Sequence, residues 1–141
     1  MKKLIPSDAK WLAGVLDCEG WIGMCRNYRK GGNAEGWSTF YCGITVGNTN
    51  RILITHLLKL TGVGYYSRFD IKDGVRKVRH AWDVRRRQDV RDVLTSVRPY
   101  LILKGKQAQL ILSLPKEFKH IPLKREKVYW QLRTLNKKGI M

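Results

Sequence analysis

Two carboxylates, Asp17 and Glu19, lie two residues apart in a segment that runs from Leu12 to Gly20. Apolar residues recur at helical spacing before them, which predicts a helix over about 8–19 with the acids at its C-terminal end. A helix C-terminus carries partial negative charge, so acids there are disfavoured, and a bound divalent cation is one way to offset the cost. Spacing alone favours a solvated helix end, and a metal site is the alternative.

The chain is strongly basic, because 28 Lys and Arg oppose 11 Asp and Glu and leave a formal charge of +17. Such a charge repels itself within one small domain, and a polyanionic partner would relieve that repulsion. Nucleic acid is therefore the first partner to consider. The length predicts one domain over 1–141, with a core at about 8–114 and a C-terminal helical segment at about 115–141.

Other classes of protein find less support in the sequence. Cys18, Cys25 and Cys42 lack the spacing of a zinc site or a disulfide framework, and the three histidines are scattered. No apolar run approaches the roughly 18 residues of a membrane span, and no signal-peptide core is apparent. We expect an intracellular protein without a membrane partner, in a prokaryotic cytoplasm or an encoding organelle.

The elements around the acid pair follow from periodicity and turn residues. Further helices are expected at about 49–61, 89–97, 104–114 and 124–137. Two β-hairpins are expected, 21–30 with 37–46 and 63–72 with 75–86, and Asp73-Gly74 closes the second. The order is αββαββ followed by helices, which belongs to the α+β class.

The segment 12–20 closely resembles the nine-residue signature of the LAGLIDADG homing endonucleases. Positions 12, 13, 14, 17 and 20 match, Val15 and Leu16 are conservative, and Cys18 replaces a small residue. The segment 104–108 resembles the family's later lysine-bearing segment, so the likeness covers most of 8–114. It implies an αββαββα homing-endonuclease fold with a saddle-shaped antiparallel DNA-binding sheet. The implied activity is a metal-dependent double-strand cut in a long, nearly palindromic DNA site, by an intron-encoded enzyme.

The resemblance also implies a metal-dependent site. Glu19 would be a direct metal ligand, beside the main-chain carbonyl of Cys18. Mg²⁺ is the expected cofactor, Mn²⁺ a substitute, and Ca²⁺ is expected to bind without supporting cleavage. Lys104 would act near the attacking water or the scissile phosphate, and Lys106 is its rival for that role.

One part of the family pattern is altered here. The family usually has a polar residue, often glutamine, at the end of its second strand, where this chain reads Val46-Gly47-Asn48. The role of positioning water therefore falls to Asn48 or is absent, and Arg51 is a candidate for phosphate contact. Both residues could instead simply cap or flank the following helix.

A single copy of the signature implies a partner chain, so the resemblance predicts a homodimer with an isologous interface. Small residues allow two helices to approach closely across such an interface. The predicted interface consists of Ala13, Gly14, Asp17 and Cys18. Asp17 is expected to hold this interface or to orient the ligand, rather than to bind metal itself.

Alternation along the strands predicts which side chains face double-stranded DNA. The inward-facing residues are expected to be Phe40, Cys42, Ile44 and Val46, then Val63, Tyr65, Phe69 and Ile71, then Val78, Trp82 and Val84. The DNA-binding set is then Cys25, Asn27, Arg29, Thr39, Tyr41, Thr45, Tyr66, Arg68, Asp70, Lys72, Lys77, Arg79, Asp83 and Arg85. Solvation of these residues is the alternative.

Two other functions fit the same scaffold. One is a DNA-binding protein that does not cleave, and the other is a maturase that binds intron RNA, since the basic surface would also attract RNA. The retained acids at both signature positions favour the nuclease, because a protein that only binds would be free to lose Glu19.

Overall fold

The computed structural model describes residues 1–29, 37–115 and 122–137. The elements in chain order are α1 (Pro6–Glu19), β1 (Gly20–Arg29), β2 (Trp37–Asn48), α2 (Arg51–Thr61), β3 (Tyr65–Phe69), β4 (Arg79–Val84), α3 (Arg87–Val97), the short 3-10 helix η1 (Arg98–Tyr100), α4 (Gly105–Leu112) and α5 (Pro122–Leu135). The predicted α+β class and the αββαββ order are confirmed.

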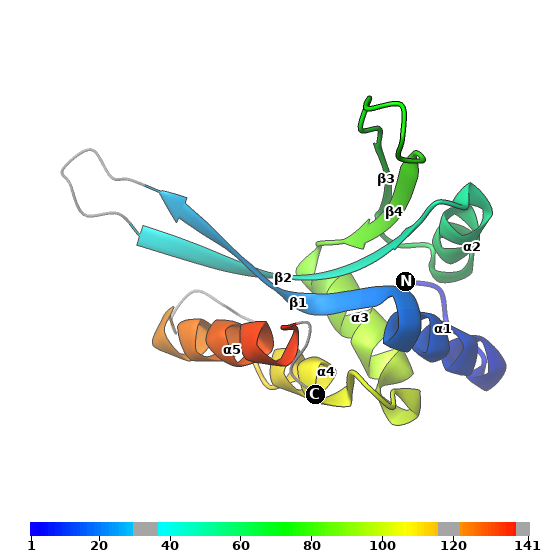
Figure 1. The fold of residues 1–141 in the computed structure, drawn as a ribbon. Coiled ribbons are helices and arrows are strands. Elements are labelled where there is room, and N and C mark those ends of the chain that lie inside the picture. The colour runs from blue at the N-terminus through cyan, green and yellow to red at the C-terminus, as the bar shows by residue number, and fades with distance from the viewer. Residues whose placement is uncertain (30–36, 116–121, 138–141) are drawn as a thin grey trace.

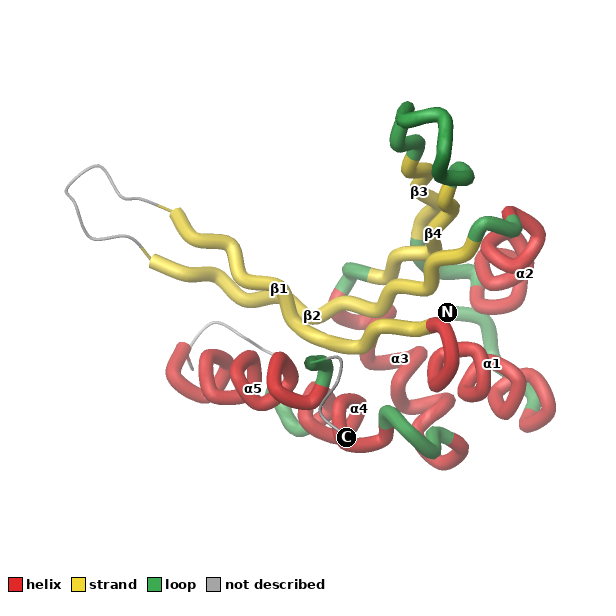
Figure 2. The backbone as a smooth tube through the Cα atoms, viewed as in Figure 1, coloured by secondary structure: helices red, strands yellow, loops and turns green. Residues whose placement is uncertain are grey.

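The four strands form one antiparallel sheet in the order β1-β2-β4-β3. Figure 1 shows the β1–β2 hairpin running out to one side and the β3–β4 hairpin rising at the other, so that the sheet is curved. Helices α1, α3, α4 and α5 lie on one side of it, and α2 packs beside β4 (Figures 1 and 2). No helix of the described residues covers the opposite, concave face, and we call it the open face.

The core lies between the sheet and the helices and follows the side-chain periods of both. Cys42, Ile44 and Val46 alternate along β2 and are buried against the helices, as the sequence predicts. Trp82 of β4 is fully buried at their side, and its indole Nε1 donates a hydrogen bond to the Val63 carbonyl at 2.9 Å. None of the helices in the described ranges has the length and apolar composition needed to cross a bilayer.

The second hairpin is shorter than predicted. Its strands cover only 65–69 and 79–84, so Asp70, Lys72 and Lys77 belong to the connecting turn. Gly74 has the expected positive φ of +71°, and the Asp73 carboxylate accepts the N–H groups of residues 75 and 76 at 2.9 Å, but residues 70–78 join the strands in place of the expected two-residue turn. The strands were predicted to be too long because residues 70–72 and 75–78, several of them charged, do not pair with one another through backbone hydrogen bonds.

The face assignment of β3 was wrong. Tyr66 pairs with the buried Trp82 and packs against the core, whereas Tyr65 pairs with Asp83 and is 52% exposed. Register is set by the partner strand, and a shift of one residue exchanges the two faces. Tyr65 and Phe69 therefore face the open side, and Tyr66 and Arg68, predicted to face DNA, lie on the other side.

Replacing Trp82 with Phe should lower the free energy of unfolding by about 1–3 kcal/mol. The smaller ring leaves a cavity and leaves the Val63 carbonyl without its buried donor. Urea denaturation followed by far-UV circular dichroism measures the loss. Trp130→Phe is the control, because Trp130 is 48% exposed and its truncation should cost less than about 0.5 kcal/mol. An equal decrease in the free energy of unfolding in the two variants would contradict the role of Trp82 as a main stabilising residue of the core.

Candidate functional site

The C-terminal end of α1 is fixed by the buried carboxylate of Asp17, which is only 8% exposed. Its Oδ2 accepts the backbone N–H of Ile102 at 2.8 Å, and its Oδ1 accepts those of Leu103 and Lys104 at 3.0 Å. Three amide donors on one carboxylate satisfy both oxygens and orient the segment that leads into α4. Asp17 is therefore a structural clamp, and the idea that it merely hydrates a helix end is wrong.

Lys104 reinforces the same junction from the other direction. Its Nζ donates hydrogen bonds to the carbonyl oxygens of Leu16 at 2.8 Å and Asp17 at 2.6 Å. A cation at these carbonyls complements the partial negative charge of the helix end. Burial lowers the pKa of Lys104, while Asp17, Cys18 and Glu19 act in the opposite direction. The chain thus supplies part of the charge compensation that the acid pair requires.

Glu19, the last residue of α1, is exposed and opens onto a cleft of about 540 Å³. Lys104 from the loop before α4 and Arg79 from the start of β4 line the same cleft. Gln107 of α4 and Asn136, just beyond α5, complete its wall. Lys106, the rival of Lys104, lies outside this cleft. A carboxylate, a lysine and an arginine from three distant parts of the sequence therefore meet at one opening.

The oxygen donors in this cleft are of the type that a divalent cation such as Mg²⁺ takes. Glu19 offers the type of oxygen ligand that Mg²⁺ prefers, and this ion keeps several waters, so it needs few protein ligands. The Asp17 carboxylate is buried and accepts three backbone N–H groups, so its oxygens already serve the chain. Within the described ranges, no three His, Cys, Asp or Glu side chains gather as a metal-binding group. Of the two acids that line the cleft in the described ranges, Glu19 is the exposed one.

Asn48 and Arg51 are not brought to this cleft. The side-chain oxygen of Asn48 accepts the N–H of Asn50 at 2.8 Å, and Asn50 in turn caps α2 by accepting the N–H of Ile52 at 2.9 Å. The Arg51 guanidinium lies 5.4 Å from the centre of the Tyr66 ring. These contacts agree with the interpretation that both residues shape the start of α2.

The four predicted interface residues divide between two faces of α1. Ala13 is fully buried and Asp17 nearly so, which means that both serve their own chain and were wrongly assigned to a helix interface. Gly14 and Cys18 are exposed, and a Cβ built at Gly14 would meet nothing within 4 Å. Trp11, 40% exposed, lies on the same side at helical spacing. The assignment was wrong because it placed all four residues on one face of the helix, whereas they lie on two.

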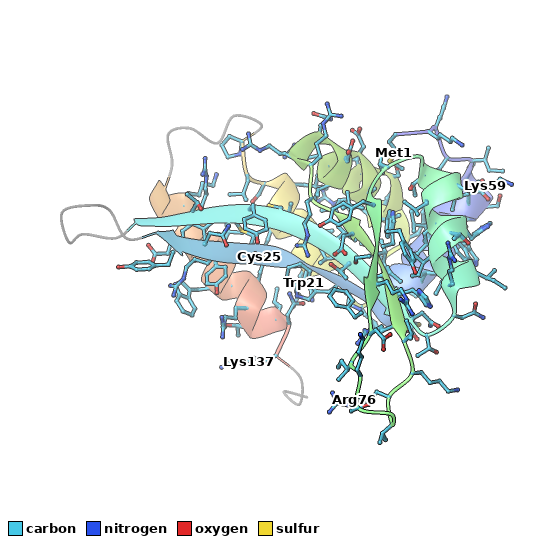
Figure 3. The ribbon with its side chains drawn as sticks, turned by 90° about the horizontal axis from the view of Figure 1, so that it is seen from above. Met1, Trp21, Cys25, Lys59, Arg76 and Lys137 are labelled. Atoms are coloured by element: carbon cyan, nitrogen blue, oxygen red, sulfur yellow. The ribbon has the colours of Figure 1, made fainter. Side chains whose placement is uncertain are left out.

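The open face carries a connected polar network at its centre. Asp83 accepts hydrogen bonds from Thr45 at 2.7 Å and Ser67 at 2.8 Å, and it pairs with Arg85 at 3.2 Å. Figure 3 looks onto this face, with Trp21 and Cys25 along β1. Strand parity places the following predicted residues on it: Cys25, Asn27, Thr39, Tyr41, Thr45, Arg79, Asp83 and Arg85. Arg29 pairs with Trp37 at the far end of β1.

Sequence analysis missed two polar residues of the cleft wall. Gln107 donates from Nε2 to the Asn136 side chain at 3.4 Å, and Asn136 donates to the Ile22 carbonyl at 2.9 Å. The Gln107 Oε1 atom is buried and, among the described residues, has no hydrogen-bond partner. The available signal was a glutamine at a position where helical periodicity favours an apolar residue. Nothing in the sequence places Asn136 beside β1.

Comparison with solved structures identifies the fold. The homing endonuclease I-CvuI, in complex with its target in the presence of Ca, superposes with a TM-score of 0.78 and 21% identity. The match covers 95% of this chain and 85% of that one. The archaeal intron-encoded homing endonuclease I-Vdi141I, complexed with DNA, gives 0.72 and 14%, over 94% of this chain and 86% of that one. In another structure, I-CvuI was solved with Mg and DNA that was not cleaved.

A longer neighbour is also informative. The LAGLIDADG meganuclease I-AabMI, bound to uncleaved DNA, matches all of this chain over 48% of its own length, with a TM-score of 0.62 and 21% identity. No protein-family model and no curated protein matches the sequence. The resemblance drawn from segment 12–20 is thus confirmed in three dimensions: the chain has the fold of the LAGLIDADG homing endonucleases.

Asp17→Asn should reduce the free energy of unfolding by about 2–3 kcal/mol. An amide offers one oxygen instead of two and turns an NH₂ group toward backbone donors that then lack a partner. Asp8→Asn, in the first turn of the same helix, is the matched control and should cost about 0.5 kcal/mol. Urea titrations of both variants give the comparison. A loss at position 17 no larger than that at position 8 would contradict the clamp.

Proposed function

We propose that this protein is a site-specific DNA endonuclease of the homing type, which acts as a homodimer and uses Mg²⁺ to cut both strands of a long duplex site. The observation that carries this proposal is the cleft at the end of α1, where Glu19 is exposed beside Lys104 at the rim of a basic, helix-free sheet. The neighbours of known structure are homing endonucleases bound to DNA, which supports the same activity.

Hydrolysis of a phosphodiester forms a bond from a water oxygen to phosphorus and breaks a bond from phosphorus to a sugar oxygen. Glu19, with main-chain oxygen at Cys18, would hold the divalent ion, which stabilises charge on the attacking and leaving oxygens when bound. Lys104 presents a partly buried ammonium to the phosphate, where it opposes negative charge as a point donor. Asp17 acts only by holding Lys104 and α1 together.

The open face would lie in the major groove. Strand β2 has 12 residues and spans about 40 Å at about 3.3 Å per residue, a length comparable to about twelve base pairs. Asn27, Thr39 and Arg85 supply hydrogen-bonding groups that suit base edges. Two such sheets related by a twofold axis would contact on the order of twenty base pairs, which requires a nearly palindromic site.

The exposed side of α1 is the proposed dimer contact. Gly14 has open space above it, and Trp11 and Cys18 flank it on the same side. Close approach of two helices there would bring the two Glu19 carboxylates toward the common axis, so that each chain completes the metal site of the other half. The match of this chain to about half of I-AabMI supports an assembly of two such units.

Glu19→Gln should reduce double-strand cleavage by about 100-fold or more while leaving DNA affinity nearly unchanged. The substrate is a plasmid library with randomised inserts, enriched first for binding in Ca²⁺ and then assayed for cutting in Mg²⁺ or Mn²⁺. Glu126→Gln, an exposed acid on α5, is the matched control and should cut at the wild-type rate.

The alternatives predict different results in the same assay. If the wild-type protein binds a specific duplex but never cuts it with either ion, a non-cleaving DNA-binding protein is correct. Preferential binding of structured intron RNA over every selected duplex would favour a maturase. Cleavage that survives in the Glu19→Gln variant would remove Glu19 from the site.

Gly14→Leu should convert the dimer to a monomer at micromolar concentration, as measured by sedimentation velocity. The larger side chain meets no atom of its own chain, and leucine favours a helix over glycine by about 0.8 kcal/mol, so the circular dichroism spectrum should be preserved. Thr95→Leu, exposed on α3, is the control and should remain dimeric. A monomeric wild-type protein, or a Gly14→Leu variant that still dimerises, would contradict this interface.

A further inference from the structure

Two glycines of β2, Gly43 and Gly47, lie on its open face. An arginine from β4 or from the residue just after it lies over each of them. Gly43 lies beneath the guanidinium of Arg85. At Gly47, a Cβ would come within 2.6 Å of Nε and 2.7 Å of Nη2 of Arg79. Glycine inside a strand costs about 0.5–1 kcal/mol relative to alanine and commonly marks a close approach of another group. Here that group is a guanidinium in both cases.

The two arginines differ in what else they contact. Arg85 pairs with Asp83 at 3.2 Å, donates to Thr45 at 3.3 Å and lies 5.6 Å from the centre of the Trp21 ring. It is held in place at the middle of the sheet. Arg79 is exposed, and no hydrogen bond or ion pair engages its guanidinium within the described part of the chain. Its donors are therefore available to a ligand.

The position of Arg79 in the sheet directs its N–H donors toward the cleft at the end of α1. It is the first residue of β4 and a diagonal neighbour of Gly47 across the strands, since Gly47 pairs with Ala81, two residues further along β4. Its side chain crosses the space above Gly47 and lines the cleft that Glu19 and Lys104 also line. Arg85, by contrast, is engaged by Asp83 and Thr45 and does not line this cleft.

We propose that Arg79 is a third catalytic residue of this cleft, contacting the scissile phosphate, and that position 47 is glycine because a side chain there would displace it. The inference rests on the proposed nuclease function. A guanidinium presents parallel N–H donors that match two phosphate oxygens, which a lysine cannot do. Donors that meet oxygens where charge develops stabilise the transition state more than the bound substrate.

This assignment gives the cleft three separate tasks. Glu19 holds the ion, Lys104 opposes charge from the α1 side, and Arg79 opposes it from the sheet side. It also accounts for the glycine at position 47, because the guanidinium fills the space that a side chain there would need.

The test is a single-turnover cleavage assay with saturating enzyme and Mg²⁺, together with DNA binding in Ca²⁺ and urea denaturation. The variants are Arg79→Ala, Arg79→Lys, Gly47→Ala and the Arg79→Ala/Gly47→Ala double variant. Arg76→Ala is the control, because Arg76 lies at the tip of the β3–β4 turn, paired with Asp73 (Figure 3).

Arg79→Ala should slow single-turnover cleavage by about 100-fold, with only a few-fold change in DNA affinity. Arg79→Lys should recover a small part of the rate. Gly47→Ala should slow cleavage in the presence of Arg79 and have no further effect in its absence, because both changes act through one guanidinium. Arg76→Ala should cut at the wild-type rate at saturation.

The outcomes separate this inference from the proposed function. If the wild-type protein cuts and Arg79→Ala cuts equally fast at saturation, Arg79 is not catalytic although the nuclease stands. A loss confined to affinity would make Arg79 a binding residue and overturn the inference in the same way. Additive effects of the two substitutions would refute the role given to Gly47. A wild-type protein that never cuts would overturn both proposals.

Discussion

The arrangement of the cleft depends on one buried carboxylate. Asp17 accepts three consecutive backbone N–H groups from residues 102–104, and Lys104 returns two hydrogen bonds to the carbonyls at the end of α1. These five contacts join segments about 85 residues apart in the sequence. Glu19 is the last residue of α1, and β1 starts at the next residue, so the position of the sheet edge relative to Glu19 is set by the same junction.

The distribution of charge explains why so basic a chain can form a compact core. The core contains mainly apolar side chains, and the buried Asp83 and Asp17 are both fully hydrogen-bonded. The cations are therefore on surfaces, including the open face and the cleft. Binding of a polyanion to such surfaces would release counterions, so affinity should fall steeply as salt concentration rises.

Helical periodicity predicted most of the fold. Helix α1 and strand β2 were placed within about two residues, because their apolar residues recur at clear periods and face one core. The β3–β4 hairpin was less predictable. Tyr65, Phe69 and Ile71 are apolar yet exposed, and only the pairing of Tyr66 with Trp82 decides which face is buried. This register depends on β4, so the sequence of the β3 segment alone does not predict it.

The candidate site was predictable only where a motif carried it. Glu19 and Lys104 came from segments with a recognised pattern, and the structure brings them to one cleft. Gln107 and Asn136 meet through tertiary packing, for which local sequence has no signal. Asn48 was assigned from its position in a strand, whereas its side chain is used in the turn that precedes α2. Polar residues beside a helix start are ambiguous in this way because capping and catalysis use the same groups.

The division of α1 into two faces has a consequence for engineering. Residues 13 and 17 are buried within their own chain, whereas residues 14 and 18 are exposed on the outer side of the helix. In the proposed homodimer, the outer residues of α1 could therefore be changed in one copy and matched in the other without disturbing the junction that holds Lys104. Complementary pairs of this kind would make that dimer an obligate heterodimer, which could be directed at DNA sequences that lack any symmetry.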